Sequence, residues 1–208
     1  MAVRPVSPAA LVEEIADLID ARTPPAWVRA AVDGAAAAGP HELADQLVDP
    51  LRVRGRAVLR VRADDFLRPA SVRLERGRAD PDAYYEDRLD VGGLSREVLE
   101  PLEPGGTGRV LPTLWDTDRD RSTRAAYVSL APGGVLLLSG DLLLGAGLAL
   151  DLVVHLEMSA EALQRRTPAG DQWTLPAYAR YAEEVGPAGL ADLVVRVNDP
   201  RRPAIVET

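Results

Sequence analysis

The apolar residues of this 208-residue chain follow two patterns, helical spacing and short continuous runs. Residues 8–22 alternate an apolar face with a mostly acidic one, which predicts an amphipathic helix ended by Pro24 and Pro25. Further helical segments are expected at residues 40–51, 159–166 and 175–185, with a short one near 94–102. Buried strands are expected at residues 27–32, 57–61, 133–138, 150–156 and 191–197.

Aliphatic strands that alternate with helices predict a parallel α/β sheet. Such sheets bind ligands at the carboxyl ends of their strands, where we expect Gly34, Asp64, Ser139 and Asn198. The length and the 47% of hydrophobic residues are enough for one full core. We therefore expect a single domain over residues 26–208, with residues 1–25 forming an N-terminal helix packed on it.

Composition narrows the classes of function. The absence of cysteine excludes disulfides, thiol nucleophiles and cysteine zinc sites, and two histidines exclude a histidine-rich metal site, so any metal would be a hard cation on oxygen ligands. The net charge of −8 argues against nucleic-acid binding, because that affinity depends on clustered basic residues. Apolar runs are too short to cross a membrane, and residues 1–10 lack the order of a signal peptide. We expect a soluble cytoplasmic protein with a small-molecule partner; the sequence leaves its oligomeric state open.

Residues 27–41 have the outline of a strand that leads into a phosphate-binding loop. A working P-loop reads G-x-x-x-x-G-K-[ST], and Gly34 and Gly39 keep the glycine spacing. Pro40 stands at the lysine position and His41 at the position of the Mg²⁺-binding hydroxyl. The shape of the loop is therefore predicted without its usual chemistry.

The order of motifs over residues 28–203 resembles the uridine kinase and phosphoribulokinase-like branch of P-loop kinases. The segments that carry the resemblance are residues 32–39, 64–69 (DDFLRP), 81–90 (PDAYYEDRLD), 114–116 (LWD), 135–140, 152–156, 165–166, 191–195 and 198–200. The resemblance implies a three-layer, parallel-sheet P-loop nucleoside kinase-like fold, with a lid remnant at about residues 165–175.

The resemblance also implies roles for individual residues on the acceptor side of such a site. Asp64 matches the carboxylate that accepts the proton of a nucleoside hydroxyl, and Asp90 matches an acceptor of ribose hydroxyls. The substrate-binding candidates are Asp90, Tyr84, Tyr85, Trp115 and Asp116, whose aromatic members could pack against a base or sugar. The alternatives are that Asp64 or Asp65 caps a turn, and that Asp90 and the aromatic candidates belong to a solvated loop with core aromatics.

On the phosphate side, the candidates are Gly34, Gly39, His41, Arg165 and Arg166. Backbone N–H groups at a helix N-terminus favour an anion even without the lysine, although a plain strand-to-helix turn is the alternative. Ser139 replaces the metal-organising carboxylate, and Asp141, two residues on, is the candidate metal ligand. Losing one transition-state group such as the lysine lowers a rate by about 10²- to 10³-fold.

Three hypotheses follow from the contrast between a complete order of motifs and a triphosphate site without its usual lysine, hydroxyl and carboxylate. The first is a degenerate kinase homologue that binds a nucleoside- or sugar-phosphate-like ligand without efficient phosphoryl transfer. The second is a divergent ATP-dependent phosphotransferase with Asp64 as base, and only this activity would require ATP and Mg²⁺. The third is a structural or partner-binding protein with a vestigial cleft, which a cleft filled by Trp115 or Arg68 would support.

Overall fold

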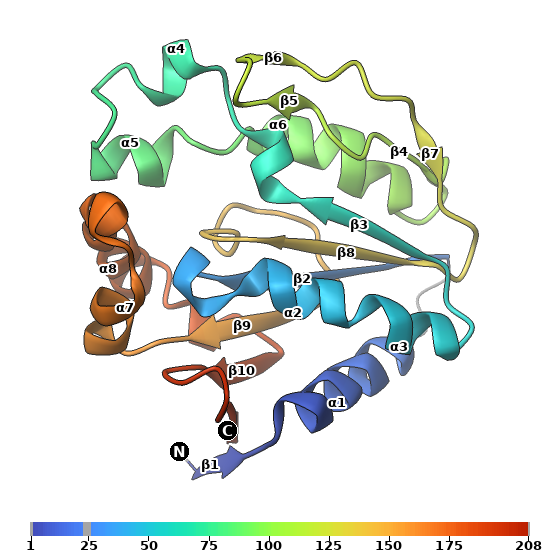
Figure 1. Ribbon diagram of the computed structural model, residues 1–208. Coiled ribbons are helices and arrows are strands. Elements are labelled where there is room, and N and C mark those ends of the chain that lie inside the picture. Colours follow the sequence, from blue (N-terminus) through green and yellow to red (C-terminus); the bar gives the residue numbers. More distant parts are fainter. Residues whose placement is uncertain (1, 23–25, 208) are drawn as a thin grey trace.

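A seven-stranded sheet forms the centre of the protein, seen in a computed structural model that describes residues 2–22 and 26–207 (Figure 1). The strand order is β1-β11-β10-β9-β2-β8-β3. The parallel part consists of β3 (Val58–Arg62), β8 (Val135–Gly140), β2 (Val28–Gly34), β9 (Leu152–Glu157) and β10 (Leu193–Arg196). The predicted parallel α/β sheet is thus confirmed, and β2 lies in its middle.

The sheet also has an antiparallel edge that the sequence analysis did not predict. β11 (Ala204–Glu207) pairs antiparallel with β10, and β1 (Ala2–Pro5) pairs antiparallel with β11. All four residues of β1 are exposed, so the strand carries no alternation of apolar and polar positions from which to predict it.

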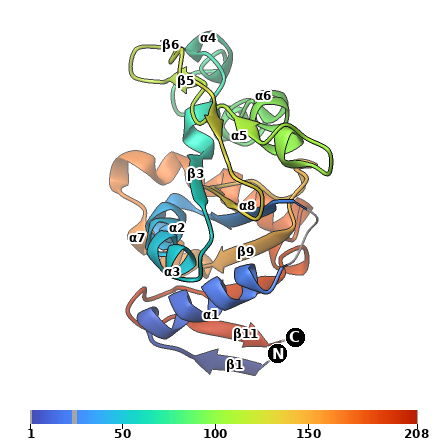
Figure 2. The same cartoon turned by 90° about the vertical axis from the view of Figure 1, so that its right-hand side faces the viewer.

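Helices cover both faces of the sheet and form a three-layer arrangement (Figure 2). One face packs against α1 (Pro8–Asp20), α2 (Pro40–Gln46) and α3 (Val48–Val53). The other packs against α8 (Leu175–Glu184) and against a helix that runs through α6 (Val91–Leu94), the π turn η3 (Ser95–Leu99) and the 3₁₀ turn η4 (Glu100–Leu102). Leu137 points into the first core and Leu138 into the second, as alternation along β8 requires.

Two predicted helices have different ends in the structure. The helix expected at residues 40–51 is divided at Leu47 into α2 and α3, because Pro50 has no N–H for the carbonyl of Gln46 and its ring crowds that carbonyl. The helix at residues 8–22 is present as α1, while its predicted stop at Pro24 and Pro25 lies outside the described residues.

Short elements complete the layer above β3 in Figure 1 and lie in segments for which the sequence analysis predicted no helix or strand. They are α4 (Ala70–Arg73), α5 (Pro81–Glu86) and two small antiparallel sheets of two strands each. In these, β4 (Arg109–Val110) pairs with β7 (Val128–Ser129), and β5 (Trp115–Asp116) with β6 (Arg121–Ser122). On the carboxyl side of the parallel strands lie α5, α8 and α7 (Ala160–Arg166) (Figure 1). Within the described part of the chain, no helix combines the length and the apolar character needed to cross a lipid bilayer.

Candidate functional site

The carboxyl ends of three neighbouring parallel strands bring together the residues that the sequence analysis selected. β2 ends at Gly34 and leads into the 3₁₀ turn η1 (Ala36–Ala38), and β3 leads into η2 (Ala63–Phe66), which carries Asp64. Ser139 is near the end of β8, and its side chain is fully buried. These candidate residues therefore lie at the carboxyl ends of the strands, where the sequence analysis placed them.

The predicted phosphate loop, residues 34–39, has a backbone that requires glycine at both of its ends. A Cβ on Gly34 would lie 2.8 Å from the Cβ of Leu156, so no larger residue fits there. Gly39 has a φ of +79°, which glycine adopts without strain, and α2 begins directly after it at Pro40.

Two backbone donors of this loop are used inside it. The N–H of Ala38 donates to the carbonyl of Ala35 at 2.7 Å, and that of Gly39 to Ala36 at 3.1 Å. Pro40 has no N–H at all. Anion-binding loops direct such N–H groups at the ligand, so the predicted phosphate role of Gly34 and Gly39 receives no help from these positions.

His41 connects the three strand ends. Its Nδ1 lies 2.7 Å from the Oγ of Ser139, and its Nε2 lies 2.8 Å from Oδ2 of Asp64. Arg60 on β3 also donates to the Ser139 hydroxyl at 3.0 Å. His41, at the hydroxyl position of the P-loop motif, is thus hydrogen-bonded within the protein. The same holds for Ser139, at the position of the metal-organising carboxylate.

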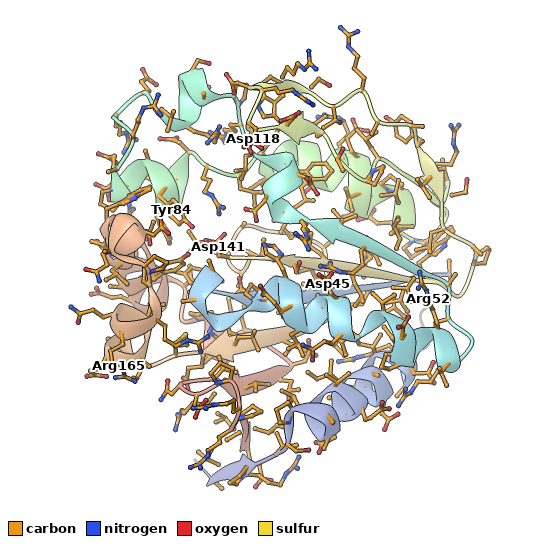
Figure 3. All side chains as sticks on the ribbon, viewed as in Figure 1. Asp45, Arg52, Tyr84, Asp118, Asp141 and Arg165 are labelled. Carbon is orange, nitrogen blue, oxygen red and sulfur yellow. The ribbon has the colours of Figure 1, made fainter. Side chains whose placement is uncertain are left out.

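Arg88, which follows α5, lies between two carboxylates. Its Nη2 donates to Oδ1 of Asp64 at 2.5 Å and its Nη1 donates to Oδ1 of Asp141. The other oxygen of Asp141 accepts hydrogen bonds from the hydroxyls of Tyr84, at 2.5 Å, and Tyr178, at 2.8 Å. Tyr84 and Asp141 accordingly point toward each other between α5 and the end of β8 (Figure 3).

The electrostatics of this cluster favour its charged form. Burial alone would raise the pKa of Asp64, but the hydrogen bond with His41 and the charge of Arg88 outweigh it and hold that pKa below its ordinary value. Burial likewise opposes the charge of Arg88, while the carboxylates of Asp141 and Asp64 raise the pKa of the guanidinium. Asp65, next in sequence, behaves in the opposite way, because burial and the charge of Asp64 raise its pKa.

A Mg²⁺ ion of the kind that P-loop kinases use does not fit this arrangement. Mg²⁺ requires oxygen ligands that are free to coordinate, usually one or two carboxylates and phosphates. Here Asp64 and Asp141 share the Arg88 guanidinium, and Ser139 bonds His41 and Arg60. No group of three or more acidic or histidine side chains in residues 2–22 and 26–207 has the arrangement of a metal site. The proposed metal role of Asp141 therefore remains a prediction, and its carboxylate is already engaged.

A second buried polar network supports the loop from below. Asp33, at the end of β2, is fully buried and accepts hydrogen bonds from the N–H of Leu143 at 2.9 Å and the hydroxyl of Tyr181 at 3.0 Å. Its Oδ2 also lies 2.7 Å from Nδ1 of His155. These contacts join β2, β9, α8 and the segment after β8, so Asp33 fixes the base of the loop.

The substrate-side candidates occupy different places. Tyr84 belongs to the central cluster, whereas the Tyr85 hydroxyl donates to Glu184 on the outside of α8. Asp90 caps α6 by accepting from the N–H of Gly93 at 2.8 Å. Trp115 and Asp116 lie in the β5–β6 hairpin, where Trp115 donates to Asp120 and Asp116 accepts from Arg119. Of the substrate-side candidates, Tyr84 alone is in direct contact with the Asp141–Arg88 cluster.

The segment predicted as a lid remnant lies beside a cavity that is separate from the central cluster. Arg165 extends from α7 away from the cluster (Figure 3) and contacts only the carbonyl of Glu161 among the described groups. Arg166 donates to the carbonyl of Val197 at 3.2 Å and lines a cavity of about 550 Å³ next to η1 and α2. Glu42 and Asp171 also line this cavity, so its polar border contains both signs of charge.

Arg88, Tyr178 and Arg60 are central to the site and were missed by the sequence analysis. Arg88 lies in the 81–90 segment that carries the resemblance, but one arginine in a polar tract gives no signal of its own. Tyr178 is on the apolar face of α8, where periodicity predicts a core residue. Their function becomes visible only when the strands place Asp64 and Asp141 near each other.

Comparison with known proteins supports the fold. No protein-family model matches the sequence, and no curated protein matches it significantly. Among solved structures, the chain is similar to a possible uridine kinase from Bacillus stearothermophilus, with a TM-score of 0.71 and 21% identity over 89% of this chain and 97% of that one.

Two further structures agree. A proposed fructose transport system kinase from Silicibacter sp. TM1040 matches with a TM-score of 0.64 and 23% identity, over 86% of this chain and 95% of that one. The YGR205w protein matches with a TM-score of 0.61 and 11% identity, over 97% of this chain and 100% of that one. At these identities the likeness concerns the fold, and it confirms that this chain has the three-layer α/β fold of the uridine kinase-like P-loop proteins.

Proposed function

We propose that this protein is a degenerate member of the uridine kinase-like P-loop proteins, which binds a nucleoside- or sugar-phosphate-like ligand without efficient ATP-dependent phosphoryl transfer. The observation that carries the proposal is the pair of side chains, His41 and Arg88, that engages Ser139, Asp64 and Asp141. These are the positions at which a working kinase of this fold would need a free hydroxyl or carboxylate.

The missing cations support the same conclusion. Pro40 replaces the lysine that would contact the transferring phosphates, and Arg165 points away from the cluster. Phosphoryl transfer relies almost entirely on positioning and on electrostatic stabilisation of the phosphates. A site without the lysine, without a place for Mg²⁺ and with a self-paired acidic side lacks both.

The divergent phosphotransferase is the weaker alternative. It requires Asp64 to accept a proton, but the lowered pKa of Asp64 makes it a poorer base and its two oxygens already bond His41 and Arg88. The hypothesis of a vestigial cleft also receives less support. It would be favoured by a cleft filled by Trp115 or Arg68, but Trp115 bonds Asp120 and Arg68 pairs with Asp87. Open cavities of about 550 and 170 Å³ remain.

The direct test is a phosphotransfer assay with radiolabelled ATP, Mg²⁺ and a panel of nucleosides and sugars. The proposal expects no transfer above that of heat-denatured protein. Transfer to any acceptor that disappears in Asp64→Asn, but persists in the matched neighbour variant Asp65→Asn, would establish the phosphotransferase instead.

A further inference from the structure

A small cavity bordered by Tyr84 has more positively than negatively charged side chains in its lining. It has a volume of about 170 Å³ and lies between the α4–α5 segment and η5 (Ala169–Thr174). Its polar and aromatic lining comes from Arg73, Arg78, Asp80, Tyr84, Arg88 and Trp173. Assigning a ligand to this cavity deepens the proposed function, on which it rests.

Two of the lining arginines lack an acidic partner. Neither Arg73 nor Arg78 has a carboxylate oxygen within 4.0 Å in the described part of the chain. Arg76, in the same segment, pairs with Glu86 at 3.0 Å and Asp87 at 3.4 Å. In a protein with a net charge of −8, arginines that face a cavity unpaired are donors available to an external anion.

The other two charged side chains that line the cavity, Arg88 and Asp80, already have partners within the protein. Asp64 and Asp141 neutralise Arg88 from the opposite side. Asp80 caps α5 by accepting from the N–H of Ala83 at 2.7 Å. The lining thus offers two arginines that form no ion pair with a described carboxylate, against one carboxylate that is used in a cap.

Arg73 is oriented by the protein rather than left mobile. Its Nε donates to the carbonyl of Arg68 at 2.5 Å, which leaves its terminal nitrogens for another acceptor. Burial and the nearby charge of Arg88 lower the pKa of Arg73, and Asp120 offsets only part of that effect. An anion beside Arg73 would relieve this repulsion between two guanidinium groups.

Size and aromatic lining narrow the ligand class. Pockets for drug-sized molecules measure roughly 300–1,000 Å³, so this cavity suits one charged group and a small body. The Trp173 ring meets Tyr84 edge to face at 5.4 Å between centroids, which holds it as a rigid wall. We propose that Arg73 and Arg78 bind the phosphate group of a small phosphomonoester in this cavity, with its organic part against Trp173.

Trp173 makes the proposal measurable. The full-length protein is titrated with inorganic phosphate, glycerol phosphate and acetate while tryptophan fluorescence is followed, and Trp173→Phe identifies the part of the signal that comes from this cavity. The expected result is saturable binding of both phosphates, tighter for glycerol phosphate, with little response to acetate.

The arginine variants decide whether the site is the one proposed. Losing one charge-assisted hydrogen bond weakens binding by about tenfold or more, so Arg73→Ala and Arg78→Ala should each do so. Arg121→Ala, which removes an exposed arginine of β6 outside the cavity, should leave the affinity unchanged. Arg78 is itself exposed, so its variant keeps the fold even if Arg73→Ala does not.

Three results would overturn the assignment: no phosphate binding, equal binding of acetate, or binding that both cavity variants retain. These readouts need no ATP and no turnover. Failure here is therefore distinguishable from detection of phosphotransfer, which would contradict the proposed function and leave the anion site standing.

Discussion

The loop side and the acidic side of this site depart from the P-loop kinase pattern in opposite ways. On the loop side, residues 34–40 contain no charged side chain, and the N–H groups of Ala38 and Gly39 bond inside the loop. On the acidic side, Asp64 and Asp141 are both present and share the Arg88 guanidinium. The loop side thus lacks charged side chains, whereas the carboxylates of the acidic side are paired with an arginine.

The difference shows how two neighbouring carboxylates can be balanced by a positive charge from within the chain. Two acidic groups at short range repel each other, and a kinase offsets this repulsion with Mg²⁺ and phosphates. Here Arg88 supplies the counter-charge from within the chain, while Tyr84 and Tyr178 donate to the remaining oxygen of Asp141. The loop side, residues 34–40, contains no carboxylate, so it needs no cation from within the chain to balance its charge.

The largest expected effect comes from removing that internal cation. Arg88→Met leaves Asp141, whose side chain is 6% exposed, without its cationic partner. Breaking a buried pair in this way should lower the free energy of unfolding by about 3 kcal/mol. Urea denaturation measures the loss, with Arg180→Met, which removes ion pairs to Glu86 of α5 and Glu184 of α8 near the surface, as the matched control.

A loss no larger in Arg88→Met than in Arg180→Met would mean that the guanidinium is not the counter-charge of the acidic side. The contrast between the two halves would then have to be explained by the tyrosines alone.

An intermediate effect is expected when the loop side is rebuilt. Pro40→Lys with His41→Ser restores a phosphate-binding cation and a hydroxyl, and it also frees Ser139 and Asp64 from the imidazole. One added charge-assisted contact should tighten ATP binding by about tenfold or more, measured by calorimetry against the single variant Pro40→Lys. A correctly folded double variant with no gain would show that the loop has lost its shape as well as its side chains.

The smallest effect concerns the pH dependence of two adjacent carboxylates. The pKa of Asp64 is lowered from its ordinary value of 3.8, so its ionisation stabilises the fold at neutral pH and that stabilisation is lost as the pH falls below 3.8. The pKa of Asp65 is raised, so its ionisation opposes folding at neutral pH and ceases to do so in acid.

Asp64→Asn should therefore lower the melting temperature at neutral pH, and Asp65→Asn should raise it slightly. Calorimetric scans from neutral pH to about pH 3 should show both differences shrinking as the carboxylates become protonated. Parallel shifts of the two variants at every pH would contradict the assigned environments.

Much of the fold follows from the sequence because its signals are local. The aliphatic runs of β8 and β9 and the helical spacing of α1 and α8 each depend on neighbouring residues, and these elements were predicted within a few positions. β1 was missed because it is exposed along its whole length and is held by β11 from the other end of the chain.

The site was only partly predictable for a related reason. Asp64, His41, Ser139 and Asp141 could be selected because each stands at or near the end of a predicted strand or at a motif position. Arg88 could not, since its role depends on two carboxylates that lie 24 and 53 residues away in sequence. Asp90 caps α6 and Asp116 accepts from the N–H of Asp118 in a turn, contacts that the sequence analysis did not predict for these two residues.

The most direct test of the central claim is a calorimetric titration of the folded wild-type protein with ATP, with and without Mg²⁺. The account predicts no Mg²⁺-dependent binding, because His41 and Arg88 engage the groups that would hold the ion. Micromolar binding that requires Mg²⁺ would contradict it, and would mean that the cluster opens to admit the metal and that the site is a working one rebuilt from other residues.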